Sequence, residues 1–286
     1  MNKAPKGRNL AGIIPLTGWG GSFDFPWPDY LQPLREGFLA VERSVYECAY
    51  AGCDSIWVVC GDDVAPLVKK RLGDYVMSPR YFEEKNFVKS REYHEKWIPI
   101  FYTPMTQKDI DRRDSLGWSA LHGALMAFQI SDKMSRWVLP TKYYVSFPYG
   151  IYDPSVVRDH RNMIRGTESF FLSREGNTVR DNLYLGFTFF PNDWPKFKHH
   201  IKNQCSGGSR SIPASERWSS RHFTLDKIFD IDIISVDRKV EVSEYYDLDT
   251  WDSLQAYYRS EMKIPRPTRQ FMKPYYHRRM IEDEEC

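Results

Sequence analysis

The strongest constraint on the fold is a regular succession of apolar and glycine-rich segments within the first 60 residues. Residues 10–16 (LAGIIPL) form an apolar run of strand length, and the TGWGGS segment that follows has glycines, which allow backbone angles closed to other residues. Apolar side chains then recur at near-helical spacing over residues 36–51, before a second apolar run at residues 54–60. Strand, loop, helix and strand in this order predict a βαβ unit, and hence a parallel sheet with a right-handed crossover.

The remainder of the chain alternates in the same way. We expect further helices at residues 64–72, 117–130 and 249–261. We expect further strands at residues 99–102, 142–147, 184–190 and 229–236. No internal repeat or long linker interrupts this pattern, so the sequence predicts one α/β domain over residues 1–262, with helices flanking a mixed, mostly parallel sheet.

Two segments depart from this alternation. Residues 77–97 are dense in charged and aromatic side chains, and we expect an insertion there. Residues 263–286 combine basic side chains, three prolines and an acidic end, which predicts an extended, weakly ordered tail. Cations interleaved with aromatic rings over residues 263–281 suit contact with nucleic acid, although an ordinary solvated terminus has a similar composition.

Composition excludes several classes of protein. Apolar residues at 42%, charged residues at 27% and a net charge of +2 are ordinary for a globular chain, and no apolar window is long enough to predict a membrane span. The five cysteines lack paired spacing and no signal-peptide core follows the N-terminus, so we expect reduced thiols and a cytoplasmic location. Aromatic residues reach 15%, which fits both core packing and stacking on bases or sugars. The oligomeric state stays open.

Several motifs together resemble the sugar-nucleotide pyrophosphorylases, nucleotidyltransferases that join a sugar 1-phosphate to a nucleoside triphosphate. The family's G-x-G-T-R loop falls on residues 18–22, and its P-K-x-L-x-P motif falls on residues 28–34. Its glycine-led helix start, which lies against the nucleoside base, falls on residues 114–121, and its W-x-D-x-G/D-T-x-x-x-L motif on residues 245–254. The resemblance implies a three-layer, Rossmann-like fold of the glycosyltransferase-A kind.

The resemblance also implies a nucleotide site with Mg²⁺. The residues that it assigns to nucleotide binding are Leu16, Thr17, Gly18, Gly20, Gly21 and Gly117. Asp247 falls on the aspartate that commonly binds Mg²⁺ in the family, and Asp153 is the carboxylate nearest to the end of the expected central strand. Both have a plainer interpretation, Asp247 as a loop carboxylate ahead of a helix and Asp153 as a turn residue beside Pro154.

Two positions differ from the family motifs in charge. Ser22 stands where the family has an arginine, and Asp29 stands where it has a lysine. Those cations neutralise triphosphate charge as the α-phosphate is attacked. A metal ion can bridge Asp29 to phosphate, so Asp29 and Asp247 are the candidate catalytic residues.

Three activities remain open at this point. The first is transfer of a nucleotidyl group to a sugar phosphate with Mg²⁺, from a bound nucleotide or nucleotide-sugar. The second is glycosyl transfer from a nucleotide-sugar donor, which fits Asp29 because such an enzyme needs no lysine at this position. Its acceptor could be DNA, given the basic tail. The third is a non-catalytic module that binds a nucleotide or sugar.

A separate group of cations suits phosphate binding, although a solvated charged loop is the favoured interpretation. Its members are Arg174, Arg180, Arg217, Arg221 and Lys227.

Overall fold

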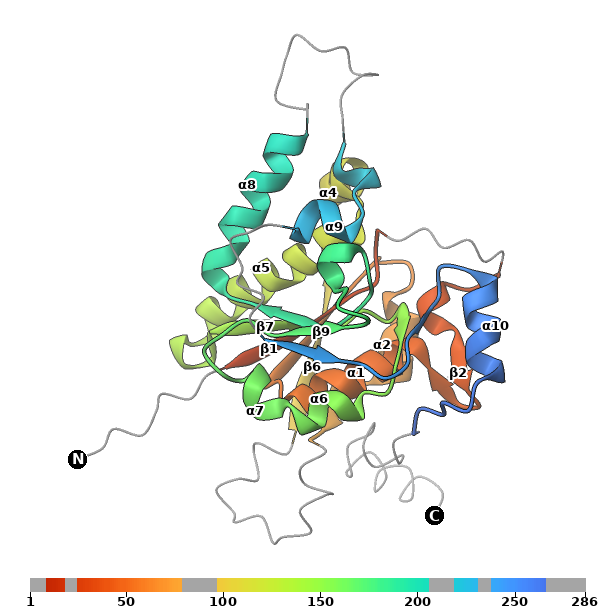
Figure 1. Cartoon of the computed structure of the whole chain (residues 1–286). Coiled ribbons are helices and arrows are strands. Elements are labelled where there is room, and N and C mark those ends of the chain that lie inside the picture. The colour runs from red at the N-terminus through yellow and green to blue at the C-terminus, as the bar shows by residue number, and fades with distance from the viewer. Residues whose placement is uncertain (1–8, 19–24, 79–96, 206–218, 231–237, 266–286) are drawn as a thin grey trace, which may run out of the picture.

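An eight-stranded sheet forms the centre of the computed structural model (Figure 1), which describes residues 9–18, 25–78, 97–205, 219–230 and 238–265. The strand order is β11-β9-β10-β7-β1-β4-β6-β5. The strands are β1 (Leu10–Pro15), β4 (Ser55–Cys60), β5 (Tyr75–Met77), β6 (Trp97–Pro104), β7 (Lys142–Val145), β9 (Phe171–Ser173), β10 (Phe187–Phe189) and β11 (Lys239–Glu241).

The sheet is mixed and mostly parallel, as expected. Strands β7, β1, β4 and β6 run parallel to one another, whereas β10 and β5 pair antiparallel on either side of this group. Every residue of β1 is buried, and so are five of the six residues of β4. Near-continuous apolar strands of this kind occur where helices cover both faces of a sheet, which is why the first 60 residues were informative.

Helices cover both faces of the sheet and complete three layers (Figure 1). On one side lie α4 (Gln107–Arg113), α5 (Leu116–Met134), α8 (Trp194–Gln204) and α9 (Leu225–Phe229). On the other lie α1 (Ala40–Ala51), α6 (Ser155–Asp159) and α7 (Arg161–Ile164), and α2 (Ala65–Leu72) links β4 to β5. None of the helices that the structure describes is both long and apolar enough to cross a bilayer.

A small unit stands beside the main sheet. Strands β2 (Pro33–Arg35) and β3 (Phe38–Leu39) form a hairpin, and α10 (Trp251–Arg259) packs against it (Figure 1). The phenol of Tyr257 in α10 donates to the carbonyl of Leu34 at 3.0 Å. A second pair of short strands, β8 (Gly150–Ile151) and β12 (Tyr246–Asp247), connects this unit to the end of β7.

Three of the expected element boundaries were wrong or only partly tested. The helix expected over residues 36–51 begins only at Ala40. Gly37 turns the chain with φ +69°, so that Phe38 and Leu39 pair with β2 as a hairpin instead of joining the helix. The strand expected over 184–190 is limited to β10, since Tyr184 lies in the preceding loop. In the strand expected over 229–236, Phe229 instead ends α9, and residues 231–237 lie outside the described residues.

The expected insertion and tail fall largely outside the described residues. Residues 79–96 are not described. The described residues on either side of them pair in the sheet, because Met77 at the end of β5 lies opposite Trp97 at the start of β6. At the other end, Ile264 is fully buried and its carbonyl accepts a bond from Arg35 at 3.1 Å. Residues 266–286 are not described, and the division into domain and tail stays a prediction.

Candidate functional site

The carboxyl ends of the parallel strands meet at one edge of the sheet, where open α/β sheets bind ligands. Leu16 and Thr17 follow β1 at this edge. The hydroxyl of Thr17 lies 2.6 Å from that of Ser119 in α5, and Ser119 donates to the Thr17 carbonyl at 2.7 Å. These bonds fasten the end of β1 to the first turn of α5.

Gly18 brings the chain even closer to α5. Its φ is +84°, and a Cβ at this position would lie 2.3 Å from the carbonyl carbon of Ser115. Only glycine satisfies both the backbone angle and the contact. Ser115 caps α5 by accepting from the N–H of Trp118 at 3.4 Å. The predicted glycine loop therefore starts against a helix N-terminus, whereas Gly20 and Gly21 lie outside the described residues.

Gly117 lies in the first turn of α5 and serves packing. A Cβ there would approach Ile228 of α9 to 2.6 Å and the ring of Phe229 to 3.2 Å. The missing side chain thus lets α9 lie close to α5. The predicted contact of Gly117 with a nucleoside base stays a prediction.

Asp29 carries an unsatisfied oxygen. It begins a single turn of 3-10 helix, Asp29–Leu31, and its Oδ1 is buried with no hydrogen-bond partner among the described residues. Desolvation raises the pKa of the Asp29 carboxyl above its usual range. The charge of Asp29, after burial and Tyr30, also raises the pKa of Tyr149, which places the carboxylate near that phenol. A buried carboxylate oxygen without a donor is costly, so this atom is suited to a ligand or a proton.

Asp247 lies at the end of β12 and organises the turn into α10. Its Oδ1 accepts from the N–H of Asp249 at 3.1 Å, and its own N–H donates to Ser253 at 2.9 Å. Burial raises the pKa of the Asp247 carboxyl, and hydrogen bonds from the backbone N–H of Asp249 and from the side chain of Ser253 oppose this rise. The neighbouring Asp249 accepts from the phenol of Tyr184 at 2.7 Å. Asp247 therefore has the structural contacts of a loop carboxylate, and a metal role is compatible with them but untested.

Asp153 occupies a turn. Its Oδ1 accepts from the N–H of Ser155 at 2.9 Å, as the plainer interpretation of this residue predicts. In the β8–β12 pairing, Asp247 faces Gly150 and Tyr246 faces Ile151, so Asp153 follows the opposite end of this ribbon. Joint binding of one ion by Asp153 and Asp247 stays a prediction.

The described residues form no complete protein cage for Mg²⁺. Among them there is no group of three or more His, Cys, Asp or Glu side chains that could hold a metal ion. Mg²⁺ is commonly bound by one or two carboxylates together with substrate phosphates and water, so one carboxylate such as Asp247 fits that mode.

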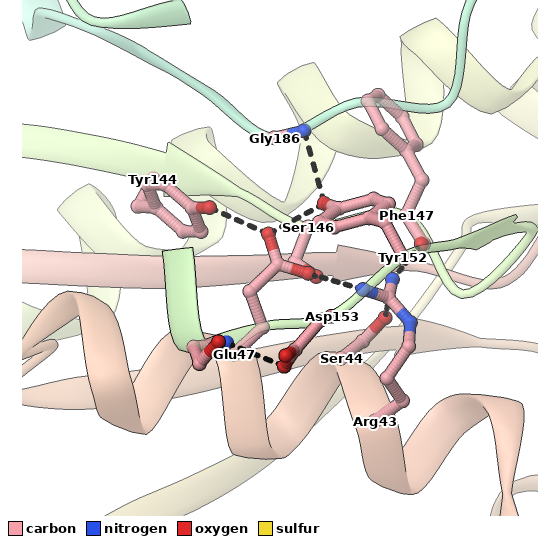
Figure 2. A network of polar contacts seen from close by, with 10 residues as sticks. Arg43, Ser44, Glu47, Tyr144, Ser146, Phe147, Tyr152, Asp153 and Gly186 are labelled. Carbon is pink, nitrogen blue, oxygen red and sulfur yellow. Dashed lines mark hydrogen bonds and ion pairs between the residues drawn. The ribbon is translucent and has the colours of Figure 1, made fainter. Parts of the chain in front are cut away.

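A buried polar network joins helix α1 to strand β7 and to the segment that follows β7 (Figure 2). Glu47 of α1 accepts from Arg43 at 2.7 Å, and both side chains are fully buried. The same carboxylate accepts three hydroxyl bonds, from Tyr144 at 2.5 Å, Ser146 at 2.7 Å and Tyr152 at 2.7 Å. Sequence reasoning missed this network, although an arginine and a glutamate four residues apart inside an apolar helix were visible signals.

The network fixes the segment that follows β7. Arg43 donates to the carbonyl of Phe147 at 2.6 Å, and Tyr152 accepts from the N–H of Gly186 at 3.2 Å. In the same segment, the phenol of Tyr149 donates a hydrogen bond to the carbonyl of Leu16 at 2.9 Å. Helix α1, strand β7 and the end of β1 are thereby joined at the candidate site.

The cation group expected from the sequence is dispersed among separate partners. Arg180 pairs with Asp230 at 2.8 Å, Arg174 pairs with Glu175 at 3.2 Å, and Arg221 donates to the carbonyl of Ile110 at 3.3 Å. Arg217 lies outside the described residues.

Comparison with known proteins identifies the fold. No family model and no curated protein matches the chain. A protein described as a glucose-1-phosphate thymidylyltransferase from Bacillus anthracis, solved with sucrose, is 11% identical, with a TM-score of 0.54 over 90% of this chain and 98% of that one. UDP-glucose pyrophosphorylase with UDP-glucose is 13% identical, with a TM-score of 0.52 over 88% of this chain and 99% of that one. Its apo form is 14% identical, with a TM-score of 0.52 over 89% and 100%. The chain therefore has the nucleotidyltransferase-like fold that its motifs predicted.

Proposed function

We propose that the chain binds a nucleotide or nucleotide-sugar at the carboxyl edge of β1 and β7, and that it transfers the nucleotidyl group to a sugar phosphate. The observation that carries this proposal is the contact of Gly18 with Ser115. It brings the glycine loop against the N-terminus of α5, and backbone N–H groups in such a place attract phosphates. The fold shared with UDP-glucose pyrophosphorylase supports the same ligand class.

In this reaction, an oxygen of the sugar phosphate forms a bond to the α-phosphorus of a nucleoside triphosphate. The bond from that phosphorus to the β-phosphate oxygen breaks, and pyrophosphate leaves with the electron pair. Thr17 and Gly18 would orient the phosphates, and Tyr149 would keep the end of β1 in place through its bond to Leu16. Mg²⁺, held by Asp247, would neutralise phosphate charge.

Asp29 favours a second candidate, glycosyl transfer. A carboxylate beside a triphosphate adds repulsion, whereas a nucleotide-sugar carries less phosphate charge. In that reaction an acceptor oxygen bonds to the sugar's anomeric carbon, the bond to the nucleoside diphosphate breaks, and the acceptor's proton passes to a base. The raised pKa of Asp29 suits that base, as does its Oδ1, which has no hydrogen-bond partner among the described residues.

Calorimetry and turnover separate these candidates. The protein is titrated with the nucleoside triphosphates and with UDP-glucose, with and without Mg²⁺, and then assayed for pyrophosphate from triphosphate plus glucose 1-phosphate. Pyrophosphate release supports nucleotidyl transfer, and release of nucleoside diphosphate from UDP-glucose supports glycosyl transfer. Saturable binding without either product supports a binding module, and no binding below millimolar concentration contradicts the whole proposal.

Asp247→Asn and Asp153→Asn form a matched pair for the metal. Asparagine keeps an oxygen that accepts the existing backbone bonds but removes the charge. If Asp247 alone holds Mg²⁺, Asp247→Asn abolishes the Mg²⁺ dependence of nucleotide binding and Asp153→Asn leaves it unchanged. An unchanged dependence in Asp247→Asn would make this residue purely structural.

A further inference from the structure

Three exposed aromatic side chains and one half-buried ring form a surface that is here called the aromatic platform: Trp27, Trp251, Tyr258 and the half-buried Phe25. The rings of Phe25 and Trp27 are stacked, with centroids 5.0 Å apart and planes 6° apart. Trp251 meets Phe25 edge to face at 6.0 Å. Trp27, Trp251 and Tyr258 are 42%, 46% and 47% exposed, which is high for such large rings.

Hydrogen bonds hold two of these exposed rings in place. The buried side chain of Gln32 accepts from the indole N–H of Trp27 at 3.2 Å and donates to the phenol of Tyr258 at 3.0 Å. Tyr258 in turn donates to the carbonyl of Pro33 at 2.6 Å. A buried amide thus fixes two aromatic rings from different elements. Surface rings fixed in advance lose little conformational entropy when a ligand stacks on them.

The platform is continuous with the candidate site along two segments of the chain. Trp27 precedes Asp29 by two residues, and Trp251 begins α10 directly after the turn that Asp247 organises. A third carboxylate, Asp252, is exposed next to Trp251. The carboxylate of Asp252, which has no metal role in the proposed function, disfavours a phosphate group bound directly over the platform, whereas sugar hydroxyl groups can donate to it.

We propose that the aromatic platform binds a neutral oligosaccharide. Because Trp27 is stacked on Phe25 whereas Trp251 meets Phe25 edge to face, one sugar ring stacks its apolar face on Trp27 and another sugar ring stacks on Trp251, while sugar hydroxyls donate to the bordering Asp252. Exposed apolar patches rimmed by polar side chains commonly mark sites of ligand binding or interaction. The assignment of this saccharide as an acceptor rests on the second candidate function, glycosyl transfer; its binding to the platform does not.

The test uses the full chain on an array of neutral and acidic glycans, followed by titration of the best neutral glycan with tryptophan fluorescence as the signal. The test variants are Trp251→Ala, which leaves the Gln32 bonds in place, and Trp27→Ala/Trp251→Ala. The matched control is Trp137→Ala, because Trp137 is 87% exposed and follows the far end of α5. We expect a neutral glycan to bind, with affinity at least about tenfold weaker in both platform variants and unchanged in the control.

Three results would overturn the proposal: no neutral glycan binds, the control loses affinity as the platform variants do, or the platform variants weaken the binding of acidic glycans or a dT10 oligonucleotide more than the binding of neutral glycans. Equal melting temperatures of the wild type and the variants exclude misfolding as the cause of a loss. Nucleotide calorimetry on the same proteins keeps the two proposals apart. Glycan binding without nucleotide binding would refute the proposed function alone, and the reverse would refute the platform alone.

Discussion

At Gly18, the backbone conformation and the packing against α5 both require a glycine. Its φ of +84° is one that side chains rarely adopt, and the Ser115 backbone leaves no room for a Cβ. Gly176 has a similar φ of +81°, but a Cβ there would meet no atom of the described residues within 4 Å. Substitution of Gly176 therefore measures the free-energy cost of a side chain at positive φ, and substitution of Gly18 measures this cost together with the clash against Ser115.

We expect Gly18→Ala to lower the free energy of unfolding more than Gly176→Ala does. The angle alone costs about 1–2 kcal/mol at either position, and the clash with Ser115 adds roughly 1–3 kcal/mol at Gly18. Urea denaturation of both variants measures the difference. Equal losses would mean that the loop moves away from α5 without cost, and this would also weaken the proposed phosphate site.

Cys60 supplies a test of pH dependence at the same edge. It ends β4, and burial, with Asp62 and Asp63 nearby, raises the pKa of its thiol to about 11. In the unfolded chain the thiol ionises near its ordinary pKa of 9.0, so between these values only the folded state keeps the proton. Stability therefore falls as pH rises through this window.

Accordingly, the free energy of unfolding of the wild type should decrease between about pH 8 and about pH 10.5, and Cys60→Ala should show a smaller decrease. Urea denaturation across this range provides the measurement, with each variant compared with itself at the lower pH so that the cost of the lost side chain cancels. Parallel curves for the two proteins would show that Cys60 ionises in the folded state as it does in the unfolded chain.

At the scale of elements, the central connection is the buried network between α1 and the end of β7 (Figure 2). Glu47 accepts four bonds from side chains in α1, β7 and the segment after β7. A buried charge pair is costly to desolvate, but removal of one partner costs more because the other is left uncompensated.

We expect Glu47→Gln to lower the free energy of unfolding by about 3–5 kcal/mol, since it leaves the Arg43 guanidinium buried without a counter-charge. Adding Arg43→Met to this variant should recover part of the loss. Lys69→Ala, which breaks an exposed 3.1 Å pair with Asp74, is the control and should cost at most about 1 kcal/mol. A double-mutant cycle by urea denaturation measures the coupling energy between Arg43 and Glu47. Additive losses of stability in the double variant would contradict this coupling.

The elements also show what the sequence could and could not predict. Strands β1 and β4 and helix α5 follow from apolar runs and helical spacing alone, because helices cover both faces of the sheet. The β2–β3 hairpin was missed, because Phe38 and Leu39 continue the helical spacing of α1 although Gly37 turns the chain before them. The contact of Gly18 with Ser115 and the bonds of Glu47 join residues about 100 positions apart, which single-sequence patterns do not record.

At the scale of the whole molecule, the described chain ends in a packed segment. Ile264 is buried, and its carbonyl is held by Arg35 of β2. A truncation that keeps residue 265 therefore keeps this contact, whereas one that stops before residue 264 removes it. A chain that ends at Pro265 thus lacks the basic residues beyond it but keeps the contact of Ile264 with Arg35.

We expect the full chain to bind duplex DNA weakly, with an affinity that falls as salt rises, and the chain ending at Pro265 to lose this binding. The reason is electrostatic, because residues 266–286 contain five Lys and Arg side chains that can neutralise phosphates. Fluorescence anisotropy at two salt concentrations measures the binding, and nucleotide calorimetry checks that the truncated chain keeps its ligand site. Equal DNA affinity of both chains would exclude a nucleic-acid role for the terminal segment.

The burial of Ile264 has a geometric consequence for any such ligand. The chain beyond residue 265 starts beside β2, where the carbonyl of Pro33 also holds Tyr258. A fully extended stretch of 21 residues, the length of 266–286, spans at most about 75 Å. The part of a polymer that the terminal cations bind would therefore remain within that radius of Pro265, and the length of the segment would set its effective local concentration.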